Sequence, residues 1–257
     1  MSKILVVPDV HGRTFWKKVT EEIDNYDKVV FLGDYLDAYD FEDISNEQTI
    51  ENFKEIIDFK KQHNDKVILL FGNHDMPYAF TAYFKFSSYH CRIMRNDYDT
   101  IRKLFVDNID LFQLAYVYED IIFTHAGIES GWLYSFIDEN ADINEICDAV
   151  NGLTDSDEKL RQLFKITSPR GGRDKHGSCI WTDIEDMIWQ CNLPRNPNAH
   201  ITPIMKTKQV FGHTLQAFRD YTNKIQMGNE EVFGNYMMLD CAKVFILDTE
   251  NFIITKL

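Results

Sequence analysis

The stretch Val6-Val7-Pro8-Asp9-Val10-His11-Gly12-Arg13 decides the fold of this chain. The apolar residues at positions 4–8 predict a short buried strand that ends in a turn. Because residues two positions apart share a face of an extended strand, Asp9 and His11 are expected to point toward one place just beyond it. Ligands bind at such carboxyl ends of strands in open α/β sheets, and a carboxylate beside an imidazole suits a divalent ion such as Mn, Fe or Zn.

The same pattern recurs four times along the chain. Apolar runs at 29–32 and 67–71 end in Gly33-Asp34-Tyr35-Leu36-Asp37 and Gly72-Asn73-His74-Asp75, and runs at 121–123 and 208–211 end in Thr124-His125-Ala126-Gly127 and Gly212-His213-Thr214. Helical patterns at 15–23 and 50–60 separate the first three runs, which predicts a βαβαβ unit with a parallel sheet. Because ligand-type residues follow five strands, the turns indicate one functional site.

The segments between these motifs are less specific. The aromatic segment 77–110 is typical of a helix packed over the core, or of a lid that brings Arg92 or Arg95 toward a substrate. The loop 167–178 combines arginine, lysine and glycine, which suits either an anion site or an ordinary surface loop. Runs at 237–240, 244–247 and 252–254 predict closing antiparallel strands. We expect a single domain over 1–257, with helical insertions around 77–110 and 130–200.

Composition and charge exclude several classes of protein. Hydrophobic residues make up 44% of the 257, which is enough for a sizeable core and argues against disorder. The formal net charge of −14 argues against a nucleic-acid partner, although a phosphorylated substrate stays open because bound metal ions can dominate the local charge. Five scattered cysteines, a short apolar run near the start and no run long enough to cross a membrane favour a cytoplasmic protein without a membrane partner.

Taken together, the motifs resemble those of the calcineurin-like metallophosphoesterase superfamily. The resemblance runs from residue 4 to about 248, and every element of the family pattern is present in order after an apolar run. The forms at 33–37 and 124–127 are similar to the phosphoprotein-phosphatase branch, which includes Ser/Thr protein phosphatases and symmetrical dinucleoside tetraphosphate hydrolases. The resemblance implies an α/β fold, a four-layer α/β/β/α sandwich of two mixed sheets flanked by helices, with a metal site at the C-terminal ends of strands.

The resemblance also implies a role for each motif residue. It implies two divalent metal ions bridged by one carboxylate, with manganese favoured and iron or zinc as alternatives. His74 would be the general acid that protonates the leaving oxygen, and Asp37 would orient it and raise its pKa. The implied ligands are Asp9, His11 and Asp34 for the first ion, and Asp34, Asn73, His125 and His213 for the second.

One position departs from the pattern. The phosphoprotein-phosphatase branch usually has an arginine that clamps the phosphate directly after the second Asp of the Gly-Asp-x-x-Asp motif, and here that position is Ala38. Arg170 and Arg173 are the first candidates to replace it, because related enzymes carry a phosphate-binding arginine between the last two histidine motifs. Arg92 and Arg95 are the second candidates.

The function expected from the resemblance is hydrolysis of a phosphate ester or anhydride by metal-activated hydroxide. The substrate would be a phosphorylated small molecule, a nucleotide or a phosphoprotein, and the missing clamp weakens the case for a phosphoprotein. The narrower alternatives are a Ser/Thr-type protein phosphatase or a dinucleoside polyphosphate hydrolase. A catalytically silent binding scaffold is the alternative from another class, but such scaffolds usually lose metal ligands and here every motif is intact.

Overall fold

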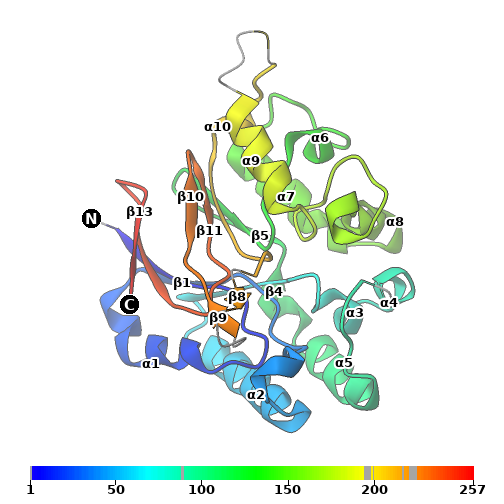
Figure 1. Cartoon of the computed structure of the whole chain (residues 1–257), viewed down its shortest axis with the longest axis vertical. Helices are drawn as coiled ribbons and strands as arrows, with labels where there is room; N and C mark the ends of the chain where they lie inside the picture. Colours follow the sequence, from blue (N-terminus) through cyan, green and yellow to red (C-terminus); the bar gives the residue numbers. More distant parts are fainter. Residues whose placement is uncertain (1, 88–89, 194–197, 199, 216, 220–224) are drawn as a thin grey trace.

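The computed structural model describes residues 2–87, 90–193, 198, 200–215, 217–219 and 225–257. Strands and helices alternate along the first part of the chain, and the second part adds further strands to each of the two main sheets (Figure 1). The predicted insertion around 130–200 therefore lies partly outside the described residues, as do positions 88–89 of the insertion at 77–110.

The first sheet contains the three strands predicted from the first three motifs. β1 (Lys3–Val7), β2 (Lys28–Phe31) and β3 (Val67–Leu70) run parallel, and β4 (Phe112–Gln113) extends them in the same direction. β12 (Phe245–Asp248) and β13 (Ile253–Lys256) add antiparallel strands beside β1, as predicted. The strand order is β13-β12-β1-β2-β3-β4, so this sheet is mixed.

The second sheet contains the strands that precede the last two histidine motifs. Its order is β10-β11-β7-β6-β5, with β5 (Ala115–Tyr118) and β6 (Ile121–Thr124) forming an antiparallel pair. β7 (Lys208–Phe211) lies parallel to β6. β11 (Tyr236–Met238) is antiparallel to β10 (Glu231–Phe233) but parallel to β7, so the expectation of an antiparallel closing strand is only half right.

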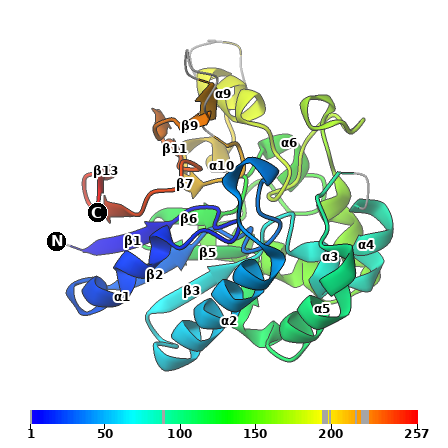
Figure 2. The ribbon, with the colours of Figure 1, turned by 60° about the horizontal axis from the view of Figure 1, so that its bottom comes forward.

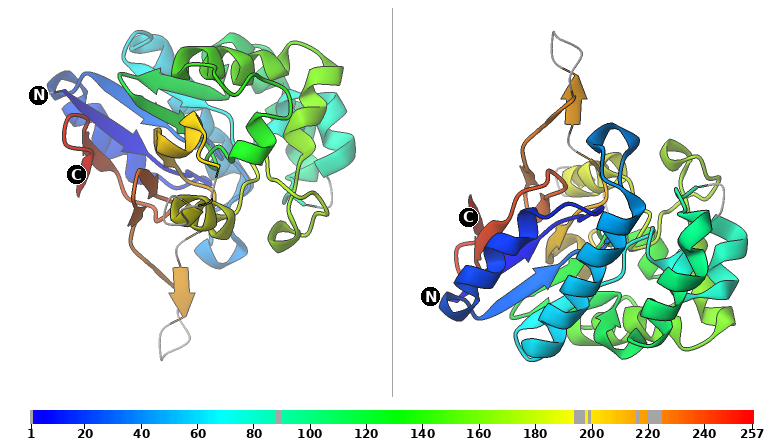
Figure 3. Two further views of the ribbon diagram at one scale, coloured as in Figure 1. Left: turned by 90° about the horizontal axis from the view of Figure 1, so that it is seen from above. Right: turned by 90° about the horizontal axis from the view of Figure 1, so that it is seen from below.

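The unexpected direction of β11 follows from the path between β7 and β11. After β7 the chain forms the antiparallel strands β8 (Ala217–Arg219) and β9 (Ile225–Met227), which project from the body of the molecule (Figure 3). It then runs through β10 and reverses at Gly234, whose φ of 65° suits glycine. The β8–β9 hairpin adds one more reversal of the chain. β11 therefore enters the sheet beside β7 and runs parallel to it.

Helices cover the outer face of each sheet (Figure 2). α1 (Lys18–Glu22), α2 (Asn46–Gln62) and α5 (Tyr98–Val106) cover the first sheet, while α7 (Ile143–Asn151) and α9 (Ile184–Asn192) cover the second. α2 begins after Ser45, which forms a capping box with Gln48. Shorter helices lie between these elements: α3 (Met76–Ala79), α4 (Thr81–Ser87), α6 (Ser130–Leu133), α8 (Asp157–Leu160) and α10 (Pro203–Lys206).

Alternating side chains of the strands separate the layers. In β1, Leu5 and Val7 join the core beneath the helices, whereas Ile4 and Val6 join the core between the two sheets. In β7, Val210 faces the other sheet and Phe211 packs with Met187 of α9. The four-layer α/β/β/α arrangement of two mixed sheets is therefore confirmed. None of the helices that the structure describes is long and apolar enough to cross a membrane.

Single 3-10 turns connect many of these elements. They are η1 (Phe15–Lys17), η2 (Ile23–Asn25), η3 (Asp40–Glu42), η4 (Arg95–Asp97), η5 (Ile109–Leu111), η6 (Gly152–Thr154), η7 (Arg161–Phe164) and η8 (Ser168–Arg170).

Candidate metal centre

The turns after β1, β2 and β3 of the first sheet meet the turns after β6 and β7 of the second. Six side chains from these turns converge, and each is buried, the most exposed at 8%. They are the six that the motifs predict as metal ligands: Asp9, His11, Asp34, Asn73, His125 and His213. The site therefore joins the carboxyl ends of strands from both sheets.

Asp34 lies at the middle of this group. Its Oδ2 is 3.5 Å from Nε2 of His11 and 3.5 Å from Nε2 of His125. Its Oδ1 accepts a hydrogen bond from the backbone N–H of His74 at 2.9 Å, so the carboxylate cannot rotate freely. One oxygen of Asp34 is thus held between two imidazole nitrogens that come from different sheets.

On the far side of Asp34, three donor atoms form a triangle. Oδ1 of Asn73 is 2.9 Å from Nε2 of His125 and 3.0 Å from Nδ1 of His213, and these two nitrogens are 3.1 Å apart. Asp9 also approaches His125, with its Oδ2 4.0 Å from Nε2 of that ring. Polar atoms from both sheets are therefore close enough together to share a cation.

Backbone carbonyls orient two of the imidazole rings. Nδ1 of His11 lies 2.8 Å from the carbonyl of Leu36, and Nδ1 of His125 lies 2.8 Å from the carbonyl of Leu32. A carbonyl only accepts, so each Nδ1 carries the proton and each Nε2 turns a lone pair toward Asp34. This is the second-shell contact that fixes the tautomer of a metal-binding histidine.

Two glycines make room for the carboxylates. A Cβ at Gly72 would overlap Oδ1 of Asp34, and a Cβ at Gly212 would overlap Oδ1 of Asp9. The backbone N–H of His213 donates to both oxygens of Asp9, at 3.0 and 3.1 Å. The glycine before Asn73 and the glycine before His213 are therefore needed for close approach.

Strained backbone also concentrates in these turns. His11, Asp34, Asp37 and His213 have φ values of 46°, 53°, 58° and 71°, a region that residues with a Cβ rarely adopt. Such conformations cluster at functional sites because the surrounding structure must hold them in place. Here the hydrogen bonds of Asp75, the last residue of its motif, hold the backbone: its carboxylate accepts from the N–H groups of Asp34, Tyr35 and Gly72 at 2.8, 3.0 and 2.7 Å.

Burial and mutual contacts shift the ionisation of the group. Burial, with the neighbouring Asp34 charge, raises the pKa of Asp9 to about 6. Burial also acts to raise the pKa of Asp34, but His125, His74 and His11 outweigh it and lower that pKa to about 2. Burial lowers the pKa of His11 and of His213, which favours the neutral, ligating form of both rings.

His74 and Asp37 form a second unit beside the cluster. Nδ1 of His74 is 2.8 Å from Oδ2 of Asp37, and the other carboxylate oxygen accepts from the hydroxyl of Tyr78 at 2.6 Å. Burial acts to lower the pKa of His74, but the charges of Asp34 and Asp37 outweigh it and raise that pKa. The motifs gave no signal for Tyr78, which lies in an aromatic segment whose pattern does not single out any one tyrosine.

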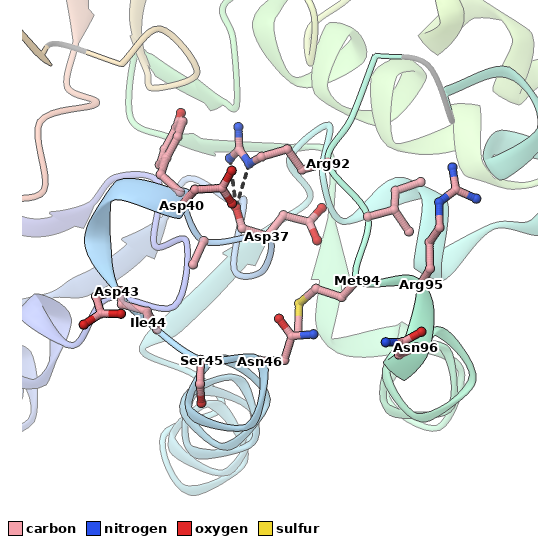
Figure 4. A pocket seen from close by; sticks show the side chains of 13 residues that line it. Asp37, Asp40, Asp43, Ile44, Ser45, Asn46, Arg92, Met94, Arg95 and Asn96 are labelled. Carbon is pink, nitrogen blue, oxygen red and sulfur yellow. Dashed lines mark hydrogen bonds between the residues drawn. The ribbon is translucent and has the colours of Figure 1, made fainter.

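A polar cleft opens beside Asp37 (Figure 4). Its volume is about 630 Å³, and it is lined by the segments 37–40, 43–46 and 92–96. Arg92 donates to the backbone carbonyl of Asp37 from Nε and Nη2, at 3.1 and 2.8 Å, and its guanidinium lies 3.9 Å from the ring centroid of Tyr39. The exposed Arg95 lines the same cleft, so the two arginines that the sequence offers as second candidates lie at one cleft.

The two arginines of the basic loop take different positions. Arg170 donates to the hydroxyl of Thr214, next to His213, and forms an ion pair with Asp183 at 2.6 Å. Arg173 is exposed and lines a separate pocket of about 280 Å³ with Tyr83 and His90. Arg170 therefore borders the candidate metal centre, and Arg173 faces a neighbouring hollow.

The residues present fit divalent cations. Ligand atoms of Asp9, Asp34 and His125 all lie within 4.8 Å of one another, and all three residues are buried. Two buried carboxylates so close together repel each other unless a cation lies between them. The mixed oxygen and nitrogen donors suit the borderline divalent metals.

Comparisons with known proteins bear on this site. A family model described as calcineurin-like phosphoesterase matches residues 2–198. No curated protein matches the sequence. A serine/threonine phosphatase structure from Saccharomyces cerevisiae, described as similar to human phosphatase PP5, has a TM-score of 0.49 and 14% identity over 99% of this chain and 79% of that one. A metallophosphoesterase structure from Sphaerobacter thermophilus has a TM-score of 0.46 and 15% identity over 99% of this chain and 87% of that one.

The family match spans the first four motifs and the clustered ligands that they supply. The chain belongs to the calcineurin-like phosphoesterase family and is a metal-dependent phosphoesterase.

Proposed function

We propose that the chain hydrolyses a phosphate ester or anhydride at a centre of two divalent ions. Asp34 would bridge the ions, with Asp9 and His11 on one side. Asn73, His125 and His213 would complete the other side. The observation that supports this most strongly is the position of Asp34, whose Oδ2 is equidistant, at 3.5 Å, from imidazole nitrogens on its two sides.

The chain's own groups would then handle the proton and the leaving group. Bound divalent ions would polarise the phosphoryl group and lower the pKa of the attacking water. His74 would protonate the departing oxygen, because Asp34 and Asp37 keep its pKa raised and Asp37 fixes its orientation. The hydroxyl of Tyr78 would hold Asp37 in place through the second carboxylate oxygen.

The metal, the compartment and the substrate are also proposals. We take Mn²⁺ as the first ion to test, with Fe and Zn as alternatives that the same donors suit. The structure describes all five cysteines and shows no disulfide among them, which supports a reducing cytoplasmic compartment. The cleft beside Asp37 would hold the leaving group, and it could accept a nucleotide as in a dinucleoside polyphosphate hydrolase, or a peptide as in a Ser/Thr-type protein phosphatase.

The experiment is hydrolysis by metal-stripped protein that is re-supplied with Mn²⁺, Fe²⁺ or Zn²⁺. The substrates would be p-nitrophenyl phosphate, bis-p-nitrophenyl phosphate, diadenosine tetraphosphate and a phosphopeptide. We expect turnover that depends on the metal and a bound stoichiometry of two ions per chain by elemental analysis. The preferred substrate then separates monoesterase, diesterase, nucleotide hydrolase and protein phosphatase. Two bound ions with no turnover on any substrate would favour the silent scaffold instead.

A further inference from the structure

Three arginines contact the turns that form the candidate metal centre. Arg13 donates to the backbone carbonyl of Asp9 at 3.2 Å, and Arg170 donates to the hydroxyl of Thr214. Arg92 donates twice to the backbone carbonyl of Asp37. Each guanidinium is therefore close enough to the centre to affect how it binds an anion.

These arginines differ in whether a carboxylate neutralises them. Arg13 is paired with Glu42 at 2.6 Å, and Arg170 is paired with Asp183 at 2.6 Å. Across the described residues, Arg92 forms no ion pair, although it is half-buried. A partly desolvated cation without a counter-charge is unfavourable unless an anion occupies the site in the working protein.

The guanidinium of Arg92 is also held in a fixed orientation. One edge bonds the carbonyl of Asp37 through Nε and Nη2, and its plane packs on the ring of Tyr39. Nη2 lies 3.5 Å from Nδ1 of His11, but that nitrogen donates its own proton to Leu36, so it accepts nothing from Arg92. Nη1 has no hydrogen bond to the part of the chain that the structure describes, so the outer edge of the fork is left for a ligand.

Figure 4 shows where that fork lies. Arg92 reaches over Asp37, at the point where the polar cleft meets the turn that carries Asp37, the hydrogen-bond partner of His74. An anion on the outer edge of Arg92 would therefore be next to His11 and close to the group that we propose as the general acid. A planar fork matches two oxygens of a phosphoryl group, which a lysine cannot do.

We propose that Arg92 binds the phosphoryl group of the substrate and supplies the positive charge for which Ala38 has no side chain. The inference rests on the proposed phosphoesterase function. It assigns the role to a loop outside every metal-ligand motif, and it ranks Arg92 ahead of Arg170, whose charge Asp183 already neutralises. It also predicts a preference for dianionic monoesters, because the contact strengthens with the charge on the phosphoryl oxygens.

The test compares Arg92→Ala and Arg92→Lys with the wild-type protein loaded with metal. For Arg92→Ala we expect kcat/KM on p-nitrophenyl phosphate to fall about 100-fold, the scale of losing one charged contact to a transition state. We expect a smaller loss on the monoanionic bis-p-nitrophenyl phosphate, and weaker competitive inhibition by inorganic phosphate by roughly tenfold. Arg92→Lys should recover only part of the loss, and added guanidinium should raise the rate of Arg92→Ala.

Arg161→Ala is the matched control, because it removes an exposed arginine far along the chain from these turns and should leave the kinetics unchanged. Equal losses on the monoester and the diester, with unchanged phosphate inhibition and no guanidinium rescue, would assign Arg92 a structural role and overturn the inference. If the wild-type protein binds two ions but has no turnover, the proposed function fails first. Active wild-type protein with an unaffected Arg92→Ala variant rejects the inference alone.

Discussion

At the scale of single residues, the pair of His74 and Asp37 separates proton transfer from metal binding. The ring of His74 is held by Asp37 at 2.8 Å, while its backbone N–H bonds Asp34. The side chain is therefore free for chemistry, and the backbone contact survives substitution of the ring. This geometry allows a mutation that removes the acid and keeps the metal ligands in place.

Replacing His74 by Asn should keep two bound ions and lower kcat by about 10²- to 10⁴-fold on an alkyl phosphate, the range for loss of a general acid. On p-nitrophenyl phosphate the loss should be much smaller, because that leaving group departs without a proton. Steady-state kinetics on both substrates, with metal content measured on the same samples, tests this. His63→Asn, at the opposite end of β3, is the control, and equal losses on the two substrates would reject His74 as the acid.

At the scale of the elements, the ends of the strands hold the ligands by backbone contact. The turn after β7 approaches Asp9 so closely that only a glycine fits at position 212. The N–H of His213 bonds the same carboxylate, so the position of Asp9 depends on the second sheet as much as on β1. A single methyl group at this contact should therefore disturb metal binding without changing any ligand.

Gly212→Ala should displace Asp9 and weaken metal binding by roughly 10- to 100-fold, as for other changes to groups that support a ligand. Overpacking should also lower the free energy of unfolding by about 1–3 kcal/mol. Metal titration and chemical denaturation measure the two effects. Gly152→Ala is the matched control, because its Cβ would meet Asp155 at an ordinary 3.4 Å; similar metal affinity in both variants would show that the turn adapts.

At the scale of the whole molecule, the sequence predicted the strands and the convergence of their turns. An apolar run followed by a glycine and a polar residue reports burial and a turn, and these are local properties. The direction of β11 was half wrong because it depends on the extra hairpin between β7 and β11. From the sequence, Arg92 is a candidate for the phosphate clamp only after Arg170, because its bond to a backbone carbonyl leaves no sequence pattern. The same holds for Tyr78, whose hydroxyl reaches Asp37 across 41 positions.

The candidate centre also joins the two sheets, and this leads to a prediction about stability. Asp9, Asp34 and Asn73 follow strands of the first sheet, while His125 and His213 follow strands of the second. Ions bound among them would stabilise only the folded state. Metal at 100 times its dissociation constant adds about 2.7 kcal/mol per site, which for a chain of this length raises the Tm by roughly 5–10 °C.

Because the proposed centre holds two ions, chelation should lower the Tm of the loaded protein by roughly twice that per-site amount, and re-supplied Mn²⁺ should restore it in proportion to the logarithm of its concentration. Asp34→Asn should lose most of this shift and retain at most one ion, because it removes the oxygen between His11 and His125. Asp58→Asn, an exposed carboxylate on α2, should keep the full shift. Scanning calorimetry measures the Tm shift, and elemental analysis of the same samples counts the bound ions. If Asp34→Asn still bound two ions and kept the full Tm shift, metal would join the sheets without a bridging carboxylate.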